Sequence, residues 1–173
     1  MYNTLYSFDF DETLIHTMLP EPGKQIWQEK TGSVWPHRGW WSKVETLDIS
    51  IFDTPKNEWV YKKYVDAKND PSGYLILATG RLDTVTGMRD AVSKILEYYN
   101  FQFDELYLNW GGDTFKFKTT LFEKMISKTG CRHFVMYDDR LEHLPHFEEW
   151  AKTQMCVVTI VDVVNKTAKT FNS

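Results

Sequence analysis

The stretch that decides the fold is residues 6–14, which read YSFDFDETL. An apolar run ends there in two carboxylates, Asp9 and Asp11, and Thr13 follows. Because side chains alternate along a strand, Asp9 and Asp11 are predicted to lie on the same side of its C-terminal end, which is where α/β sheets bind ligands. Two adjacent carboxylates repel one another, so the pair indicates a divalent cation, an acid/base division of labour, or both. The alternative is a solvated turn, in which Asp and Thr are common.

The composition predicts one globular domain over residues 1–173. Hydrophobic residues make up 42% of the chain and charged residues 25%, which are ordinary values. We expect no membrane partner, because no run of about 18 apolar residues is present, and the acidic start of the chain is unlike a signal peptide. Cys131 and Cys156 match no disulfide or zinc spacing, which favours a cytoplasmic location. The net charge of −4 argues against a broad basic surface for nucleic acid but leaves local recognition open.

Five apolar, β-rich runs alternate with helical patterns along the chain. The runs are residues 4–10, 74–79, 105–109, 133–137 and 157–161. The helical patterns extend to about residue 69 from an N-cap at Thr54, and over about 83–99, 119–129 and 144–153. Strands that alternate with helices predict a three-layer α/β fold with a mainly parallel sheet and right-handed crossovers.

Residues 15–53 interrupt this alternation. They are rich in proline and glycine, and an apolar stretch at 47–52 predicts a short strand. We interpret the segment as a loop or small flap inserted after the first strand, because it is too short for an independent domain. It contains Trp35, Trp40 and Trp41, for which packing is the default role and a platform for stacking a terminal base is the alternative.

A second group of polar residues, Thr79, Gly80 and Arg81, follows the second predicted strand. A hydroxyl and exposed backbone N–H groups at a strand-to-helix turn form a cradle for phosphate, and glycine permits close approach. The alternative is a capped turn. Arg81 is a candidate for binding substrate phosphate, with a structural ion pair as the other interpretation.

Two further groups complete the pattern. Lys118 stands at the start of the third helical pattern, where a cation opposes the helix dipole and so indicates an anion facing it, with Lys116 as the rival candidate. Asp138 and Asp139 follow the fourth strand, and helix capping accounts for only one of these two carboxylates. His143 either approaches this site or is a partly buried residue at a helix start.

These groups resemble, in order and context, the motifs of the haloacid dehalogenase (HAD) superfamily of phosphotransferases. The four motifs are here Asp9-x-Asp11-x-Thr13, Thr79, Lys118 and Asp138-Asp139. A narrower likeness is to the "Swiss Army Knife" RNA-repair-like HAD domains. It is carried by WPHRGWW at 35–41, LATGR at 77–81, TFKFK at 114–118 and YDDRLEH at 137–143.

The resemblance implies a Rossmann-like, five-stranded sheet in the order 5-4-1-2-3, with the first strand central and no large cap domain. It implies a Mg²⁺-dependent phosphatase in which Asp9 forms a phospho-aspartyl intermediate and Asp11 is the general acid and base. The metal ligands are then Asp9, the Asp11 carbonyl and the Asp138–Asp139 pair. Many relatives carry Glu at the position of Asp138, which favours Asp139 as the direct ligand.

Substrate contacts are expected from the remaining groups. Those to phosphate come from Thr79, Lys118, Thr13, Gly80 and Arg81, and those to a base from Trp40.

The substrate itself stays open between a phosphorylated RNA or DNA end and a small molecule such as a nucleotide. A third possibility is a non-catalytic RNA- or protein-binding module, which would have no need of Asp11. A monomer is assumed, since the sequence does not determine the oligomeric state.

Overall fold

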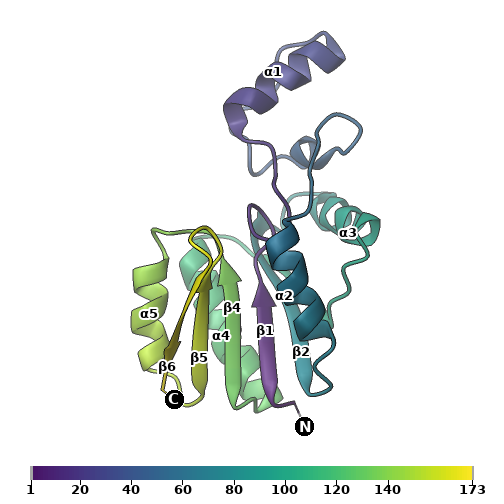
Figure 1. Ribbon diagram of the computed structural model, residues 1–173. Coiled ribbons are helices and arrows are strands. Elements are labelled where there is room, and N and C mark those ends of the chain that lie inside the picture. Colours follow the sequence, from purple (N-terminus) through teal and green to yellow (C-terminus); the bar gives the residue numbers. More distant parts are fainter. Residues whose placement is uncertain (1, 173) are drawn as a thin grey trace.

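A central sheet with helices on both faces forms the body of the protein in the computed structural model, which describes residues 2–172 (Figure 1). Six strands have the order β3-β2-β1-β4-β5-β6. Their bounds are β1 Thr4–Phe8, β2 Gly73–Leu82, β3 Glu105–Asn109, β4 His133–Asp138, β5 Val157–Asp162 and β6 Thr167–Phe171. The first five strands are parallel and have the order that the family resemblance implies, with β1 between β2 and β4.

The sixth strand, β6, was not predicted. It pairs antiparallel with β5 at the edge of the sheet. Three of its five residues are polar and four are exposed, so it lacks the continuous apolar pattern that marks the buried parallel strands.

Each face of the sheet is covered by two helices, which gives three layers. Alternating side chains of the strands point to opposite faces, as Phe134 and Val135 of β4 do, and each face has its own apolar core. One face is covered by α2 and α3, the other by α4 and α5. The bounds are α2 Glu58–Lys68, α3 Met88–Tyr98, α4 Thr114–Thr129 and α5 Leu144–Lys152.

Three helix starts differ from the prediction. The first helical pattern begins at Glu58, because Asn57 rather than Thr54 accepts hydrogen bonds as its N-cap. The second begins only after Gly87, whose φ of 80° no helical residue adopts. The third begins at Thr114, capped by Asp113, so Lys118 lies in the second turn of α4 rather than at its start.

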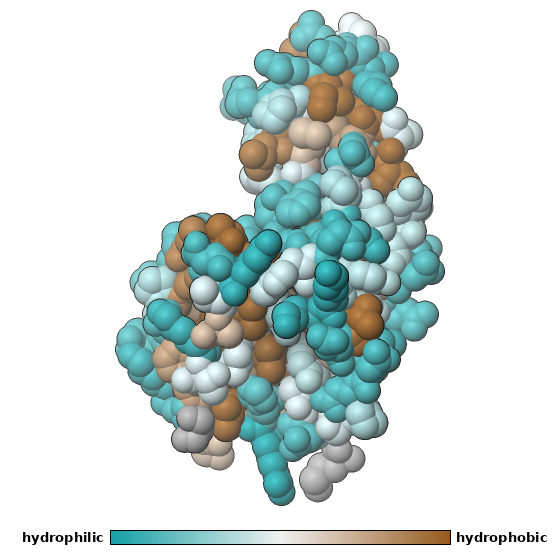
Figure 2. Space-filling model, viewed as in Figure 1, coloured by the Kyte–Doolittle hydropathy of each residue, from teal (hydrophilic) through white to brown (hydrophobic). Residues whose placement is uncertain are grey.

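The insert at residues 15–53 projects beyond the carboxyl ends of the strands (Figure 1). It contains α1 (Pro20–Thr31) and a 3₁₀ helix, η1 (Val44–Leu47). The strand predicted at 47–52 is wrong, because Leu47 ends η1 and the residues after it form turns. Trp35, Trp40 and Phe52 form a separate small core here, and Figure 2 shows further apolar side chains on the surface of this projecting part.

Two backbone segments that run side by side connect the insert to the body. His16 N donates to Pro55 O at 2.8 Å, and Asn57 N donates to Leu14 O at 2.8 Å. These segments join the insert to the body directly above the ends of the central strands (Figure 1), and Leu47 of η1 adds a second contact, since it is buried in the core beneath α3. Within residues 2–172, no helix combines the length and hydropathy that crossing a membrane requires.

Candidate active site

Three carboxylates meet at the carboxyl end of the sheet, as the strand register dictates. Phe8 of β1 pairs with Tyr137 of β4, so the residues that follow each of them lie side by side. One oxygen each of Asp9, Asp138 and Asp139 lies within 4.8 Å of the others. Asp9 and Asp138 are buried and Asp139 is half-buried. The structure thus brings together the first and fourth motifs.

A buried lysine, only 1% exposed, connects two of these carboxylates. Nζ of Lys118 lies 2.6 Å from Asp138 Oδ2 and 3.0 Å from Asp9 Oδ1. Burial alone would lower the pKa of Lys118, but the attraction of Asp138 and Asp9 raises it. These carboxylates are the anions expected to face Lys118, although the lysine lies in the second turn of α4 rather than at its start. The rival candidate Lys116 is exposed.

One lysine is too little positive charge for three carboxylates. Burial raises the pKa of Asp9 to about 6, although Lys118 acts against this shift. Burial and the neighbouring Asp9 and Asp138 raise the pKa of Asp139 to about 8. Both shifts mean that the fully ionised cluster is unfavourable without further positive charge.

The cluster fits a divalent cation such as Mg²⁺. Its donors are all carboxylate oxygens, which Mg²⁺ prefers. Oδ1 of Asp9 is buried and accepts no well-aligned hydrogen bond, even though Lys118 Nζ is only 3.0 Å away. A buried oxygen without a hydrogen bond is costly unless another partner, such as a metal ion, satisfies it.

Asp11 is held by Arg81. Nε of Arg81 donates to Asp11 Oδ2 at 2.9 Å and Nη2 donates to Oδ1 at 2.7 Å, a two-pronged ion pair. Nη1 donates to the Trp41 carbonyl at 2.7 Å and to the Thr46 hydroxyl at 2.8 Å. With an exposed fraction of 3%, Arg81 has most of its donors occupied inside the protein. The expectation that Arg81 binds substrate phosphate is therefore not supported, and its alternative, a structural ion pair, describes it.

Of the other residues of the expected phosphate site, Thr13 contacts the cluster, Gly80 lines the pocket that opens onto it, and Thr79 is buried next to them in the chain. Thr79 is buried and its hydroxyl accepts a hydrogen bond from the Arg81 backbone N–H at 3.2 Å. Thr13 is also buried, and its hydroxyl donates to Asp139 Oδ1 at 3.4 Å. A Cβ at Gly80 would lie 3.1 Å from Thr114 Cγ2, so only glycine fits there without displacement.

A pocket of about 420 Å³ opens onto the carboxylates. Its walls come from four stretches of the chain: Asp9, Asp11, Glu12, Trp41, Gly80, Arg81, Asp139, Arg140, Leu141 and Glu142. Of the wall at 140–142, the sequence indicates Arg140 as a candidate for substrate phosphate, with a structural ion pair as the alternative, but it assigns no role to Leu141 and Glu142.

The tryptophan at this pocket is Trp41, which is 40% exposed. Trp40, expected to bind substrate, is instead only 4% exposed in the core of the insert, where its Nε1 donates to Met18 O at 2.7 Å. That expectation is wrong, because Trp40 packs against Phe52 inside the insert.

His143 does not line the pocket. It is half-buried at the N-cap of α5, against the rings of Phe115 and Phe147. Burial, with the nearby charge of Arg140, lowers its pKa. This corresponds to the second interpretation of His143, a partly buried residue at a helix start.

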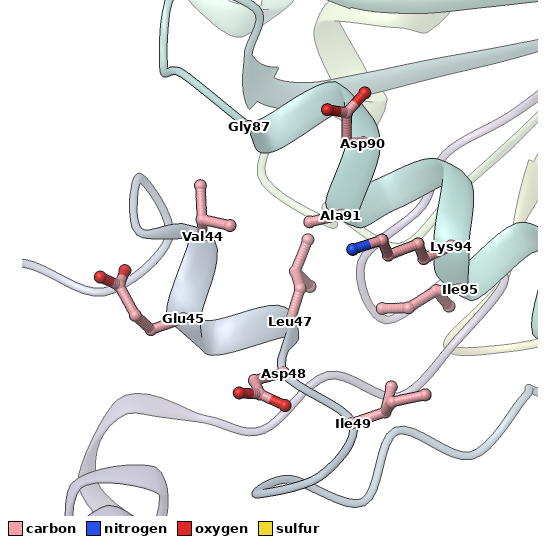
Figure 3. A pocket seen from close by; sticks show the side chains of 10 residues that line it. All are labelled: Val44, Glu45, Leu47, Asp48, Ile49, Gly87, Asp90, Ala91, Lys94 and Ile95. Atoms are coloured by element: carbon pink, nitrogen blue, oxygen red, sulfur yellow. The ribbon is translucent and has the colours of Figure 1, made fainter.

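A larger pocket, of about 580 Å³, lies between η1 and α3 (Figure 3). Its lining is mainly apolar, with the charged groups of Glu45, Asp48, Asp90 and Lys94 around it. None of these four belongs to the cluster of possible metal ligands found among residues 2–172. The smaller pocket is therefore the better candidate for chemistry.

Comparison with known proteins gives one match. The sequence model of a family described as HAD domain family 1 in Swiss Army Knife RNA repair proteins matches residues 19–170. The matched range contains Thr79, Lys118 and the Asp138–Asp139 pair, whereas Asp9 and Asp11 precede it. No curated protein and no solved structure matches the chain.

Proposed function

Because the chain belongs to HAD domain family 1 of the Swiss Army Knife RNA repair proteins, we propose that it is a phosphatase whose nucleophile is Asp9. One observation carries the proposal. Asp9 lies at the pocket with a buried oxygen that is paired only with Lys118, beside two further carboxylates. Because this cluster favours additional positive charge, it suits a substrate phosphate that binds together with a cation.

The proposed reaction has two steps. First, a carboxylate oxygen of Asp9 attacks phosphorus, the bond from phosphorus to the leaving oxygen breaks, and Asp11 donates a proton to that oxygen. Then Asp11 removes a proton from water, which attacks phosphorus and releases inorganic phosphate and the free Asp9 carboxylate. Lys118 orients Asp9 through its contact with Oδ1.

Mg²⁺, held by Asp9, Asp139 and the backbone carbonyl of Asp11, would offset the repulsion between the carboxylate and the phosphate. Asp139 is the better direct ligand of the fourth motif, because Oδ2 of Asp138 is already bound to Lys118 at 2.6 Å. Asp138 then serves mainly to hold the lysine, which in turn faces Asp9.

A phosphorylated RNA or DNA end is the proposed substrate. The pocket lies beneath a small insert, and Trp41 exposes its ring at the wall, where a terminal base can stack on it. Half-buried Arg140, beside Gly80, is the cation available for a further phosphate of a polymer. The alternative is a nucleotidase, in which the same wall would bind the single base of a nucleotide.

The test is release of phosphate from p-nitrophenyl phosphate with and without Mg²⁺, by wild type and by Asp9→Asn. We expect Asp9→Asn to retain less than about a thousandth of wild-type activity, because loss of a lone nucleophile typically costs that much or more. Lys116→Met, which changes an exposed lysine of the same helix, is the control and should be fully active.

A folded Asp9→Asn protein with substantial activity would contradict the role of Asp9. A wild type inactive towards aryl phosphates, mononucleotides and phosphorylated oligonucleotides would leave the binding module as the better description.

A further inference from the structure

We propose that Arg81 is a positioning residue that makes the orientation of Asp11 depend on how the insert is seated on the body. The inference deepens the proposed function and rests on it, since Asp11 is the general acid and base there. No substrate contact of Arg81 is needed.

The guanidinium of Arg81 is shared between the site and the insert. Two of its N–H groups hold both oxygens of Asp11, and two others bond the Trp41 carbonyl and the Thr46 hydroxyl. All four distances lie between 2.7 and 2.9 Å. Because the fork is planar and rigid, the two acceptors in the insert fix the plane in which the Asp11 carboxylate is held.

The acceptor at Thr46 is itself fixed in place. Its hydroxyl is buried, donates to Lys43 O at 2.7 Å and accepts from Arg81. It lies in η1, whose Leu47 is buried in the same core as Ile95 of α3. Figure 3 shows the Leu47 side chain pointing from η1 towards α3. The packing of Leu47 against the body thus fixes the position of η1 and of the Thr46 hydroxyl within it.

The acceptor at Trp41 connects the pocket with the hydrogen bonds that hold Arg81. Trp41 lines the pocket and is 40% exposed, and the guanidinium carbon of Arg81 is 5.5 Å from its ring centroid. Its backbone carbonyl holds Arg81. A ligand that contacts the ring therefore touches the residue that orients Arg81, and through it Asp11.

Removing one acceptor has a defined consequence. Without the Thr46 hydroxyl, a buried N–H of Arg81 loses its partner, and the guanidinium shifts towards another acceptor or water. Asp11, which must carry its proton on a lone pair that Arg81 leaves free, then loses the orientation from which that proton reaches the leaving oxygen. Misplacement by about 1 Å can cost as much as 10²-fold in rate.

The experiment compares Thr46→Val, which has the shape of threonine without the hydroxyl, with Thr46→Ser, which keeps the hydroxyl. Each is assayed at saturating Mg²⁺ with p-nitrophenyl phosphate and with an alkyl phosphate, whose poor leaving group needs the proton. We expect Thr46→Val to lower kcat about 10-fold or more for the alkyl phosphate and less than about 3-fold for p-nitrophenyl phosphate. Thr46→Ser should restore the wild-type ratio of the two rates.

An unchanged ratio in Thr46→Val, or equal loss with both substrates, overturns the inference, since a merely structural role lowers both rates together. If Thr46→Val does not fold, Arg81→Lys decides instead, because a lysine keeps the charge but cannot hold Asp11 and both insert acceptors at once. Arg81→Lys should show the same selective loss of kcat with the alkyl phosphate. A wild-type ratio of the two rates in this variant overturns the inference. Failure of the proposed function is recognised separately, by an active Asp9→Asn protein.

Discussion

Replacing Lys118 by methionine should destabilise the metal-free protein more than any surface ion pair would. Lys118, Asp9 and Asp138 are nearly inaccessible to solvent, and the lysine is 2.6 and 3.0 Å from the two carboxylates. At an effective dielectric constant of about 20, two unit charges roughly 3 Å apart attract one another by roughly 5 kcal/mol. Methionine fills the space of the side chain but leaves the carboxylates without a counter-charge.

The expected loss is about 3–5 kcal/mol, the usual cost of breaking a buried pair from one side. For a chain of this size it corresponds to a melting temperature lower by about 6–20 °C. The measurement is urea unfolding with a chelator at pH 7, followed by circular dichroism. Lys116→Met is the matched control, because Lys116 is exposed on the same helix.

The double variant Lys118→Met/Asp138→Asn should recover part of the loss, since it removes one of the stranded charges. Added Mg²⁺ should stabilise Lys118→Met more than it stabilises wild type. A loss below about 1 kcal/mol, the range of surface pairs, would refute the reasoning that this lysine is the counter-charge of the site.

Three further outcomes are expected. With the pKa of Asp139 raised to about 8 and that of Asp9 to about 6, the metal-free folded state keeps protons that the unfolded chain releases near pH 4. Its free energy of unfolding should therefore fall as the pH rises from about 4 to 8. Mg²⁺ should raise the melting temperature more at pH 8 than at pH 5. A metal-free protein that gains stability over this range would contradict the raised pKa values of Asp9 and Asp139. Asp11→Asn should lose far more activity with an alkyl phosphate than with p-nitrophenyl phosphate when phosphorylation limits the rate, and equal losses would remove its role as acid. Trp41→Ala should lower kcat/KM for a phosphorylated oligonucleotide by about 5- to 150-fold, corresponding to a stacking contact of about 1–3 kcal/mol, while Tyr98→Ala, at an exposed residue outside the pocket, should not. A mononucleotide processed as well as the oligonucleotide would favour the nucleotidase.

The body of the fold was predictable because each buried strand carries a continuous apolar run, and each run ends at a polar motif. Because parallel strands place their carboxyl ends at one edge of the sheet, Asp9, Thr79 and Asp138 were expected to lie close together. The helix α1 was missed because Pro20 and Pro22 suggest a loop. Proline fits the first turn of a helix, however, and Gly23 lets Trp40 pack closely, since a Cβ there would lie 2.2 Å from the indole.

The roles of neighbouring residues were the least predictable part of the site. Trp40 and Trp41 are adjacent and chemically identical, and only the folded insert determines that the first is buried and the second lines the pocket. Arg81 is a similar case. Its partners Trp41 and Thr46 lie some forty residues away in a segment without regular pattern, so neither spacing nor composition indicates them.

The central position of β1 has a consequence for synthesis on the ribosome. Thr4 pairs with His133, roughly 130 residues later in the chain. At translation rates of about 5–20 residues per second, the first strand waits roughly 6 to 26 seconds for its second neighbour. During that time its apolar side chains lack one partner strand, which makes the nascent chain a candidate for chaperone binding. The carboxylates also gather only once Asp138 and Asp139 have left the exit tunnel, so the growing chain cannot assemble this carboxylate cluster early.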